Sequence, residues 1–328
     1  MKILVDAFGG DNAPLEILKG CEMAVSEYNV EIILTGDKAI IEKVAAENGI
    51  SLKGMEIVHC TDVISMEDHP SELMKSKKDC SLAVALRLLS EGAADGFVGA
   101  GSTGAILMGA TLIVKRIKGV KRPALAPVMP CEGGKFMLID CGANADCRPE
   151  MLVQFAKMGS VYMENVLGVN NPRVGLVNIG TESTKGDELR IDTYTQLKET
   201  PLNFVGNVEA RDVPYGGCDV AVADGFTGNV LLKTFEGTAS FVSSKFKEVF
   251  KKNLKNKLAA AVILKDLNAV KKSLDYNEYG GAPFLGVKKP VFKAHGSSTA
   301  LTFKNAIGQL VSFINADVIE KISSGLEE

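Results

Sequence analysis

The sequence predicts an α/β protein in which a doubly wound, mostly parallel sheet is flanked by helices. Short apolar runs alternate with helical patterns from the first residue onward, as expected when crossover helices join parallel strands. Several of these runs end in loops rich in Gly, Ser, Thr and Asn, and open α/β sheets bind ligands at the carboxyl ends of their strands. With 328 residues, 46% of them hydrophobic, the chain is long enough for one large domain, and we treat residues 1–328 as a single domain.

The composition argues against several classes of protein. The formal net charge of −3 gives no overall reason to expect binding to nucleic acid. The 7 cysteines are scattered and include no CxxC pair, so the sequence predicts neither a zinc site nor a disulfide framework, and no metal or other cofactor is expected. The N-terminal MKILVDAFGG begins directly with a strand, and no apolar run approaches the length of a membrane span. We therefore expect a cytoplasmic protein.

The elements are expected to follow one another as alternating strands and helices. The first strand is Lys2–Asp6, and a helix begins near Pro14, where Asp11 or Asn12 can act as its cap. Further strands are expected at 31–34, 56–59, 97–99, 136–140, 173–179, 203–205, 219–223 and 290–293, with helices at 39–48, 81–91, 105–114, 149–166 and 246–274.

The stretch DGFVGAGSTGAI at 95–106 carries the strongest local signal for an anion site. An apolar run ends at Gly99, and Gly104 opens a helix whose first N–H groups face whatever lies before them. The glycine spacing also matches a dinucleotide-binding fingerprint. That fingerprint needs an acidic residue about 20 positions further on, whereas the next acid here is Glu132. We interpret the loop as a phosphate cradle, and an ordinary glycine-rich turn is the alternative.

A second loop, DGFTGN at 224–229, repeats this arrangement of strand, Gly-hydroxyl-Gly turn and helix. The expected strands 136–140 and 173–179 end in the similar loops CGANADCRP and GTESTKGDE, the latter with Lys185. Because such loops meet at one edge of a parallel sheet, their convergence is a stronger signal than any one of them.

The segment at about 240–275 is expected to be a protruding, basic, amphipathic helical segment. Apolar residues recur at three- and four-residue spacing, among them Leu254, Leu258, Ile263 and Leu267. The stretch from 245 to 272 contains nine lysines but only two acidic residues, Glu248 and Asp266. This pattern is typical of a helix that contacts a membrane surface or an acidic partner. The same pattern also fits a helix packed on its own core or on a dimer partner.

His295 is the best candidate histidine for an active site. It stands in KAHGSS, between the strand at 290–293 and the final helix, and so occupies the same kind of strand-to-helix loop as the glycine motifs. The lysines at 75, 77 and 78 form a run of positive charge. Such a run is interpreted either as a solvent-exposed surface or as a source of positive charge for a bound anion.

Motifs along nearly the whole chain resemble the phosphate acyltransferase family of fatty acid and phospholipid synthesis. The matching pieces are VDAFGGDNAP at 5–14, KKDCS at 77–81, GFVGAGSTGA at 96–105, LIDCGAN at 138–144, VNIGTESTKGDE at 177–188, FVGNVEARDV at 204–213, DVAVADGFTGNVLLKT at 219–234, and YGGAPFLGV with KAHGSS near the end. The departures are small: Phe8 stands where the family usually has Met, and Cys80 where Ser is common.

The resemblance implies reversible transfer of a long-chain fatty acyl group from acyl carrier protein to inorganic phosphate. The products would be acyl-phosphate, for glycerol-3-phosphate acylation in bacterial phospholipid synthesis, and the free carrier. It also implies the fold of phosphotransacetylases and of isocitrate and isopropylmalate dehydrogenases. A homodimer at the inner face of the cell membrane is implied as well, with glycerol-3-phosphate acyltransferase as a possible downstream contact.

Such a reaction needs positioning and charge stabilisation more than a protein nucleophile, because phosphate itself attacks and a thiolate leaves. We assign phosphate binding to Ser102, Thr103, Gly104 and Thr227, and catalytic roles to Lys185, His295 and Asn229. We expect Leu254, Leu258, Ile263 and Leu267 to contact an anionic membrane, with acyl carrier protein as the alternative partner of that helix.

Three other functions remain open from the residues. A phosphotransacetylase that uses acyl-coenzyme A would share the fold. A non-catalytic, membrane-associated scaffold of lipid synthesis would tolerate loop substitutions. An NAD-dependent decarboxylating dehydrogenase would bring an Asp cluster for Mg²⁺ and an arginine-rich carboxylate clamp, and the sequence contains no such clamp.

Overall fold

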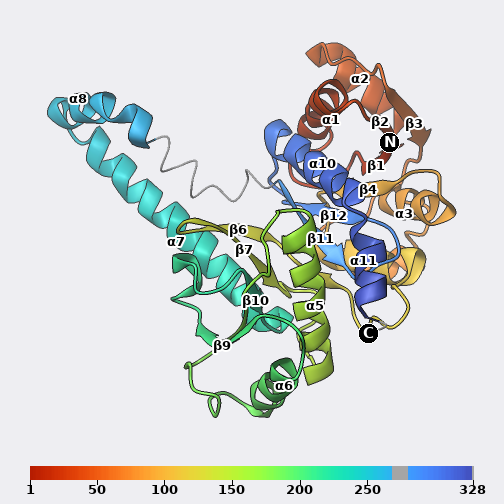
Figure 1. Ribbon diagram of the computed structural model, residues 1–328. Helices are drawn as coiled ribbons and strands as arrows, with labels where there is room; N and C mark the ends of the chain where they lie inside the picture. The colour runs from red at the N-terminus through yellow and green to blue at the C-terminus, as the bar shows by residue number, and fades with distance from the viewer. Residues whose placement is uncertain (268–279, 327–328) are drawn as a thin grey trace.

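The strands of the protein form two sheets, in a computed structural model that describes residues 1–267 and 280–326 (Figure 1). The 7-stranded sheet has the order β3-β2-β1-β4-β12-β11-β5, and the 5-stranded sheet has the order β6-β7-β10-β8-β9. Parallel pairing dominates both, so the prediction of a mostly parallel, doubly wound architecture is confirmed, although the sequence did not separate the strands into two sheets.

The 7-stranded sheet takes its strands from both ends of the chain. In sheet order they are β3 (Met55–His59), β2 (Glu31–Gly36), β1 (Lys2–Asp6), β4 (Gly96–Gly99), β12 (Val291–Ala294), β11 (Gly281–Leu285) and β5 (Ala124–Leu125). The first five run parallel, while β11 is antiparallel to both neighbours. Its helices are α1 (Leu15–Tyr28), α2 (Lys38–Asn48), α3 (Ser81–Glu91), α4 (Thr103–Gly109, continued by a π-helical turn Ala110–Val114) and α10 (Ala300–Asn315), with a 3-10 turn at Pro70–Met74.

The 5-stranded sheet is built from the middle of the chain. In sheet order its strands are β6 (Val128–Cys131), β7 (Gly134–Ile139), β10 (Val220–Val222), β8 (Val174–Asn178) and β9 (Phe204–Glu209). Only β6 is antiparallel to its neighbour. The associated helices are α5 (Pro149–Asn165), α6 (Glu188–Lys198), α7 (Gly225–Lys251) and α11 (Val318–Gly325), with a 3-10 turn at Val213–Tyr215.

The two sheets share a core. Its largest cluster of buried side chains includes Phe292 of β12 and Phe303 of α10 together with Phe155 and Tyr162 of α5. Phe292 and Tyr162 both pack against the ring of Phe313, with ring centroids 5.5 and 6.0 Å away. Aromatic packing across the junction therefore ties the sheet built from the chain ends to the sheet built from the middle.

The expected cap of α1 is wrong. Pro14 occupies the cap position without a side-chain hydrogen bond. Asn12 instead donates its amide to the carbonyl oxygens of Ser297 and Ser298, at 3.2 and 3.3 Å. Asn12, which was expected to cap α1, thus holds the loop of Ser297 and Ser298 in place instead.

Helix α7 and the short helix α8 (Leu254–Val262) extend away from both sheets (Figure 1). In α7 only Gly225 and Gly228 are buried, both in its first turns. The single helix expected over 246–274 is wrong: α7 already begins at Gly225, and Asn253 interrupts the helix and caps α8 by accepting a hydrogen bond from the Asn256 N–H. The last part of the expected helix, 268–274, lies outside the described residues.

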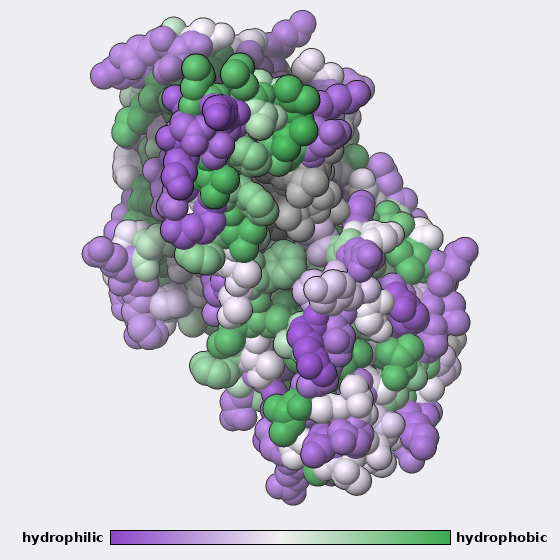
Figure 2. All heavy atoms as spheres, turned by 90° about the vertical axis from the view of Figure 1, so that its left-hand side faces the viewer, coloured by the Kyte–Doolittle hydropathy of each residue, from purple (hydrophilic) through white to green (hydrophobic). Residues whose placement is uncertain are grey.

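Figure 2 shows hydrophobic side chains gathered at the end of the molecule that carries α8, bordered by hydrophilic ones. Within the described part of the chain, none of the helices combines the length and apolar character needed to cross a bilayer.

Candidate active site

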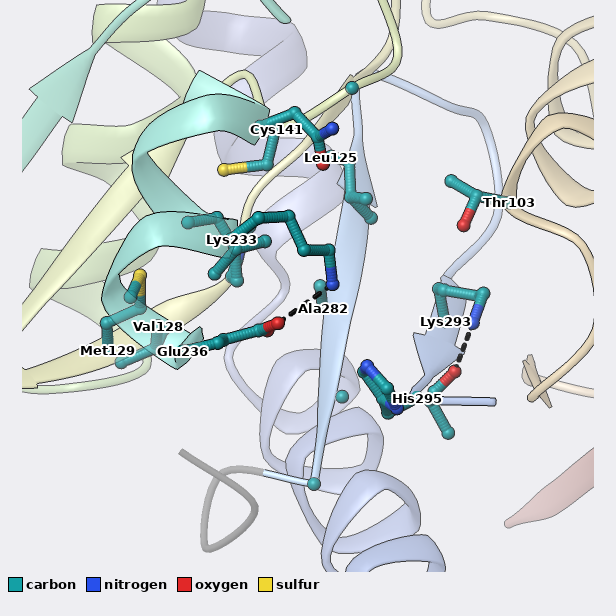
Figure 3. Close-up of a pocket in the computed structure, with 17 residues that line it drawn as sticks. Thr103, Leu125, Val128, Met129, Cys141, Lys233, Glu236, Ala282, Lys293 and His295 are labelled. Atoms are coloured by element: carbon teal, nitrogen blue, oxygen red, sulfur yellow. Dashed lines mark hydrogen bonds and ion pairs between the residues drawn. The ribbon is translucent and has the colours of Figure 1, made fainter. Parts of the chain in front are cut away.

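A cavity of about 360 Å³ lies between the two sheets (Figure 3). One part of its wall is apolar and comes from Leu125, Pro127, Val128, Met129, Cys141, Leu232 and Ala282. The other part is polar and comes from Thr103, Asn229, Lys233, Glu236, Lys293 and His295. Elements far apart in the sequence therefore meet at one place, with an apolar surface facing a cluster of charges.

Three loops at the carboxyl edge of the 7-stranded sheet pack tightly together and hold the first half of the site. A Cβ atom on Gly9 would lie 2.7 Å from the backbone nitrogen of Gly101, so only glycine allows this approach. The Asp11 N–H donates to the Gly296 carbonyl oxygen at 2.8 Å. These contacts join the first loop to the glycine loop and to the loop of His295, and they place Thr103 and His295 on the same cavity.

Asp140 organises the half of the site that belongs to the 5-stranded sheet. Its carboxylate is fully buried and accepts hydrogen bonds from the Leu125 N–H at 2.9 Å, the Ala143 N–H at 3.2 Å and the Asn144 N–H at 2.6 Å. Burial raises the pKa of Asp140 to about 6, against the effect of these hydrogen bonds. The carboxylate ties β5 to the loop after β7, and so fixes the wall on which Leu125 lies.

Helix α7 presents polar residues to the cavity from the side opposite Lys293 and Thr103 (Figure 3). Asn229 and Lys233 stand one turn apart, and Glu236 follows on the same face. Glu236 accepts a hydrogen bond from the Lys233 ammonium group at 2.8 Å. Figure 3 shows this pair reaching toward the middle of the cavity from the side opposite Lys293 and Thr103.

The polar wall carries Lys233, Lys293 and His295 together with one carboxylate, Glu236, which pairs with Lys233. Burial lowers the pKa of Lys293 to about 8, and the charge of Lys233 acts in the same direction. Burial and the charges of Lys233 and Lys293 likewise hold the pKa of His295 below its usual value. His295 also hydrogen-bonds the Ser297 hydroxyl through Nδ1 at 2.8 Å. Such a wall favours an anionic ligand, because a negative charge would reduce the repulsion among these groups.

The structure brings some of the expected site residues together and leaves others apart. Thr103, Asn229 and His295 line the cavity, while Ser102, Gly104, Thr227 and Lys185 do not. The Ser102 hydroxyl caps α4 by accepting from the Ala105 N–H. Lys185 is exposed in the loop after β8.

Thr227 belongs to a buried polar cluster outside the cavity. Its hydroxyl donates to Asp224 at 2.7 Å and accepts from the guanidinium group of Arg190 at 2.9 Å. That guanidinium also pairs with Asp224 and Asp187. The side-chain oxygen of Thr227 is therefore engaged in holding the start of α7.

Sequence reasoning missed Lys233, Glu236 and Lys293. Two signals were available. Lys233 follows Asn229 at the spacing of one helical turn. Lys293 is a charged residue inside the apolar strand VFKA, and a charge in such a strand is rare unless it has a specific role.

The expected membrane-contacting residues lie far from the cavity, on α8 and just beyond it. Leu254 and Leu258 are 72% and 61% exposed, Ile263 is exposed, and Leu267 is half-buried.

Comparison with known proteins places this arrangement in a family. The family model described as "Fatty acid synthesis protein" matches residues 1–321. A phosphate acyltransferase of Thermoanaerobacterium thermosaccharolyticum is 47% identical over 327 residues, 100% of this chain and 97% of the relative. A phosphate acyltransferase of Alkaliphilus oremlandii is 48% identical over 326 residues, 99% of this chain and 97% of the relative.

Among solved structures, a phosphotransacetylase from Streptococcus pyogenes has a TM-score of 0.64 at 17% identity, covering 98% of this chain and 94% of its own. This likeness confirms the predicted fold. The match over nearly the full length of both sequences shows that the chain belongs to the phosphate acyltransferase family, a family of acyltransferase enzymes.

Proposed function

We propose that the protein transfers a long-chain fatty acyl group reversibly from acyl carrier protein to inorganic phosphate, releasing acyl-phosphate and the free carrier. The observation that carries the proposal is the cavity itself, in which an apolar wall faces Lys233, Lys293 and His295. The apolar wall suits an acyl chain and the cationic wall suits phosphate. The names of the relatives, phosphate acyltransferases, support the same chemistry.

The reaction would proceed by direct displacement. A phosphate oxygen attacks the thioester carbonyl carbon, the carbonyl oxygen becomes an oxyanion, and collapse of this intermediate breaks the C–S bond. The sulfur leaves with the electron pair as a thiolate and is protonated on the carrier. The protein holds the two reactants in line and stabilises the developing charge. Thr103, Asn229 and His295 line the cavity and have side chains that can donate hydrogen bonds. Ser102 and Gly104 flank Thr103 in the chain, Thr227 lies in the first turn of α7, and the proposal also gives a catalytic role to Lys185, in the loop after β8.

The acyl donor and product suggest the protein's partners. Acyl-phosphate would be consumed by an acyltransferase that acylates glycerol-3-phosphate, so a downstream contact with that enzyme belongs to the proposal. A homodimer would cover part of the exposed surface of α7, where Phe241 and Phe246 are 62% and 57% exposed. Burying such side chains against a second copy is favourable.

The proposal is tested by incubating the purified protein with palmitoyl-acyl carrier protein and inorganic phosphate. Acyl-phosphate, trapped as the hydroxamate, and one free carrier thiol per acyl-phosphate are expected. Palmitoyl-coenzyme A at the same concentration serves as the second donor. A higher kcat/KM with coenzyme A would assign the protein to the phosphotransacetylase type, and absence of turnover with both donors would favour a non-catalytic scaffold.

Replacing Asn229 with Ala, or Lys185 with Met, is expected to lower acyl-phosphate formation by at least tenfold. Each change removes a hydrogen-bond donor proposed for the transition state, and a tenfold loss corresponds to about 1.4 kcal/mol of the barrier. The measurement is kcat/KM for each reactant, with unchanged Tm as the control. Activity within about threefold of the wild type, or about 0.7 kcal/mol, would remove that residue from the catalytic set.

We also propose that α8 and the residues just after it attach the protein to the anionic inner face of the cell membrane. Leu258→Glu or Ile263→Glu is expected to release the protein from anionic liposomes in a flotation assay. The change replaces an exposed apolar contact with a charge of the same sign as the lipid surface. Glu248→Gln on α7 is the control and should leave flotation intact. Unchanged binding of both glutamate variants would instead favour a dimer contact or a carrier contact for this segment.

A further inference from the structure

Lys293 is a buried cation whose residue is 8% exposed. Among the described residues, no carboxylate lies within ion-pair distance of its ammonium group, which donates to the carbonyl oxygen of Ala294. Burial of an unpaired charge is costly, so proteins normally pair such a group or use it.

Lys304 provides a comparison within the same protein. It is 9% exposed, almost the same as Lys293. Its ammonium group, however, lies 3.0 and 3.1 Å from the two carboxylate oxygens of Glu27. That partner raises the pKa of Lys304, whereas burial lowers the pKa of Lys293. The ammonium group of Lys304 thus lies beside a carboxylate that is 53% exposed, whereas that of Lys293 is held in the interior beside a carbonyl oxygen, so the charge environment of Lys293 is particular to its site.

The sheet leaves room for a ligand beside Lys293. Its partner in register on the neighbouring strand β11 is Ala282, a small residue that also lines the cavity. Lys293 lines the cavity together with Thr103 and His295, and Figure 3 shows the three side chains on the same side. The Thr103 hydroxyl and the His295 imidazole can form hydrogen bonds with a tetrahedral oxyanion that lies beside the ammonium group of Lys293.

We propose that Lys293 binds the reacting inorganic phosphate and supplies its counter-charge, with Thr103 and His295 as further hydrogen-bonding groups. This inference rests on the proposed acyl transfer to phosphate. It assigns the counter-charge of the bound phosphate to a residue that the sequence pattern did not single out, and it leaves the catalytic role proposed for Lys185 to its own test. The ligand is a phosphate dianion, and its charge takes the place that the carboxylate of Glu27 has beside Lys304.

Thermal unfolding in the presence of inorganic phosphate, without any acyl donor, tests the assignment separately from the reaction. Phosphate is expected to raise the Tm of the wild type, at ionic strength matched with chloride. Lys293→Met should raise the Tm of the ligand-free protein, because it removes an unpaired buried charge. The same variant should weaken phosphate binding by about thirtyfold or more.

Lys304→Met is the matched control. It breaks an ion pair with Glu27, whose side chain is 53% exposed, so it should change the Tm only slightly while leaving the phosphate affinity within about threefold of the wild type. Lys293→Arg retains the charge and should retain phosphate binding better than Lys293→Met, and it serves as the second variant if the methionine protein does not fold.

The pH dependence gives an independent readout. Groups that act on Lys293 are Lys233 on α7 and Asp11 in the first loop, with His295 and Glu236 on the same cavity. The ammonium group is charged below its pKa and neutral above it, so kcat/KM for phosphate should fall as the pH rises through about 8. In Lys293→Arg this alkaline limb should disappear, because a guanidinium group stays charged.

Phosphate affinity of Lys293→Met within threefold of the wild type would overturn the assignment, and so would the absence of any phosphate effect on the wild-type Tm. Failure of the wild type to form acyl-phosphate, with phosphate binding that still depends on Lys293, would reject the proposed function alone.

Discussion

Replacing Gly228 with Ala is expected to unfold or severely destabilise the protein, although the change adds a single methyl group. A Cβ atom at this position would lie 1.9 Å from the carbonyl oxygen of Asp140 and 3.0 Å from its carbonyl carbon. Both atoms belong to the backbone, so neither can move aside as a flexible side chain would. Helix α7 must then shift away from β7, and we expect a loss of at least about 3 kcal/mol in the free energy of unfolding.

The same shift would damage the site. Asn229 follows Gly228 directly, and Lys233 and Glu236 lie on the same helix at the cavity. Acyl-phosphate formation should therefore fall below detection even in the fraction of protein that remains folded. Urea denaturation and the acyl transfer assay together measure both effects.

Gly237→Ala is the control for this prediction, because Gly237 lies further along the same helix. Within the described part of the chain, no atom outside the adjoining turns of α7 lies within 4 Å of the position that a Cβ would take there. Alanine stabilises a helix interior relative to glycine by roughly 0.5–1 kcal/mol. The same substitution should thus have opposite signs at two positions of α7. Equal stability of the two variants would show that α7 does not pack on β7 as described.

The sequence could predict the parallel strands of both sheets because each is a short, largely apolar run, and most of them end in a glycine loop. The strands it missed lack that pattern. β11 reads GAPFL and β6 reads VMPC, and a proline or glycine within a run argues against a strand. β5 has 2 residues, too few for any periodicity. Since β5 and β11 pair with each other beside the cavity, the missed strands are the ones that join the two halves of the site.

The same distinction applies to the site residues. Thr103, Asn229 and His295 stand in loop motifs or directly after them, so motif reasoning found them. Lys293 lies within a strand, and its importance depends on which groups surround its ammonium group, which only three-dimensional packing reveals. Thr227 stands in a motif as well, but its hydroxyl is engaged by Asp224 and Arg190. A motif thus identifies the loop that approaches a ligand, while packing decides which of its side chains remain available.

The cluster of polar side chains around Arg190 leads to a second prediction with a large expected effect on stability. Asp224 is 4% exposed, and its carboxylate accepts hydrogen bonds from the Thr227 N–H at 2.9 Å and the Thr227 hydroxyl at 2.7 Å. It also forms an ion pair with Arg190, whose side chain is 16% exposed. One carboxylate therefore caps α7 and neutralises a largely buried guanidinium group.

Asp224→Ala is expected to lower the free energy of unfolding by about 3–5 kcal/mol, because it leaves Arg190 buried without its main partner and removes the cap of α7. Asp187→Ala is the matched control, since Asp187 pairs with the same guanidinium but its side chain is 60% exposed. An exposed pair contributes little, so the control should lose only about 1 kcal/mol, mainly as the cap of α6. Denaturant unfolding of both variants decides between a buried and a surface role.

Removing both charges separates the ion pair from the cap. In Asp224→Ala combined with Arg190→Met, the guanidinium no longer lies buried without its partner, so the double variant should be more stable than Asp224→Ala alone. The remaining loss relative to Arg190→Met measures the cap of α7. If instead the two single losses simply add, Asp224 and Arg190 act independently, and α7 is held by its own cap and not by the charge pair that joins it to α6.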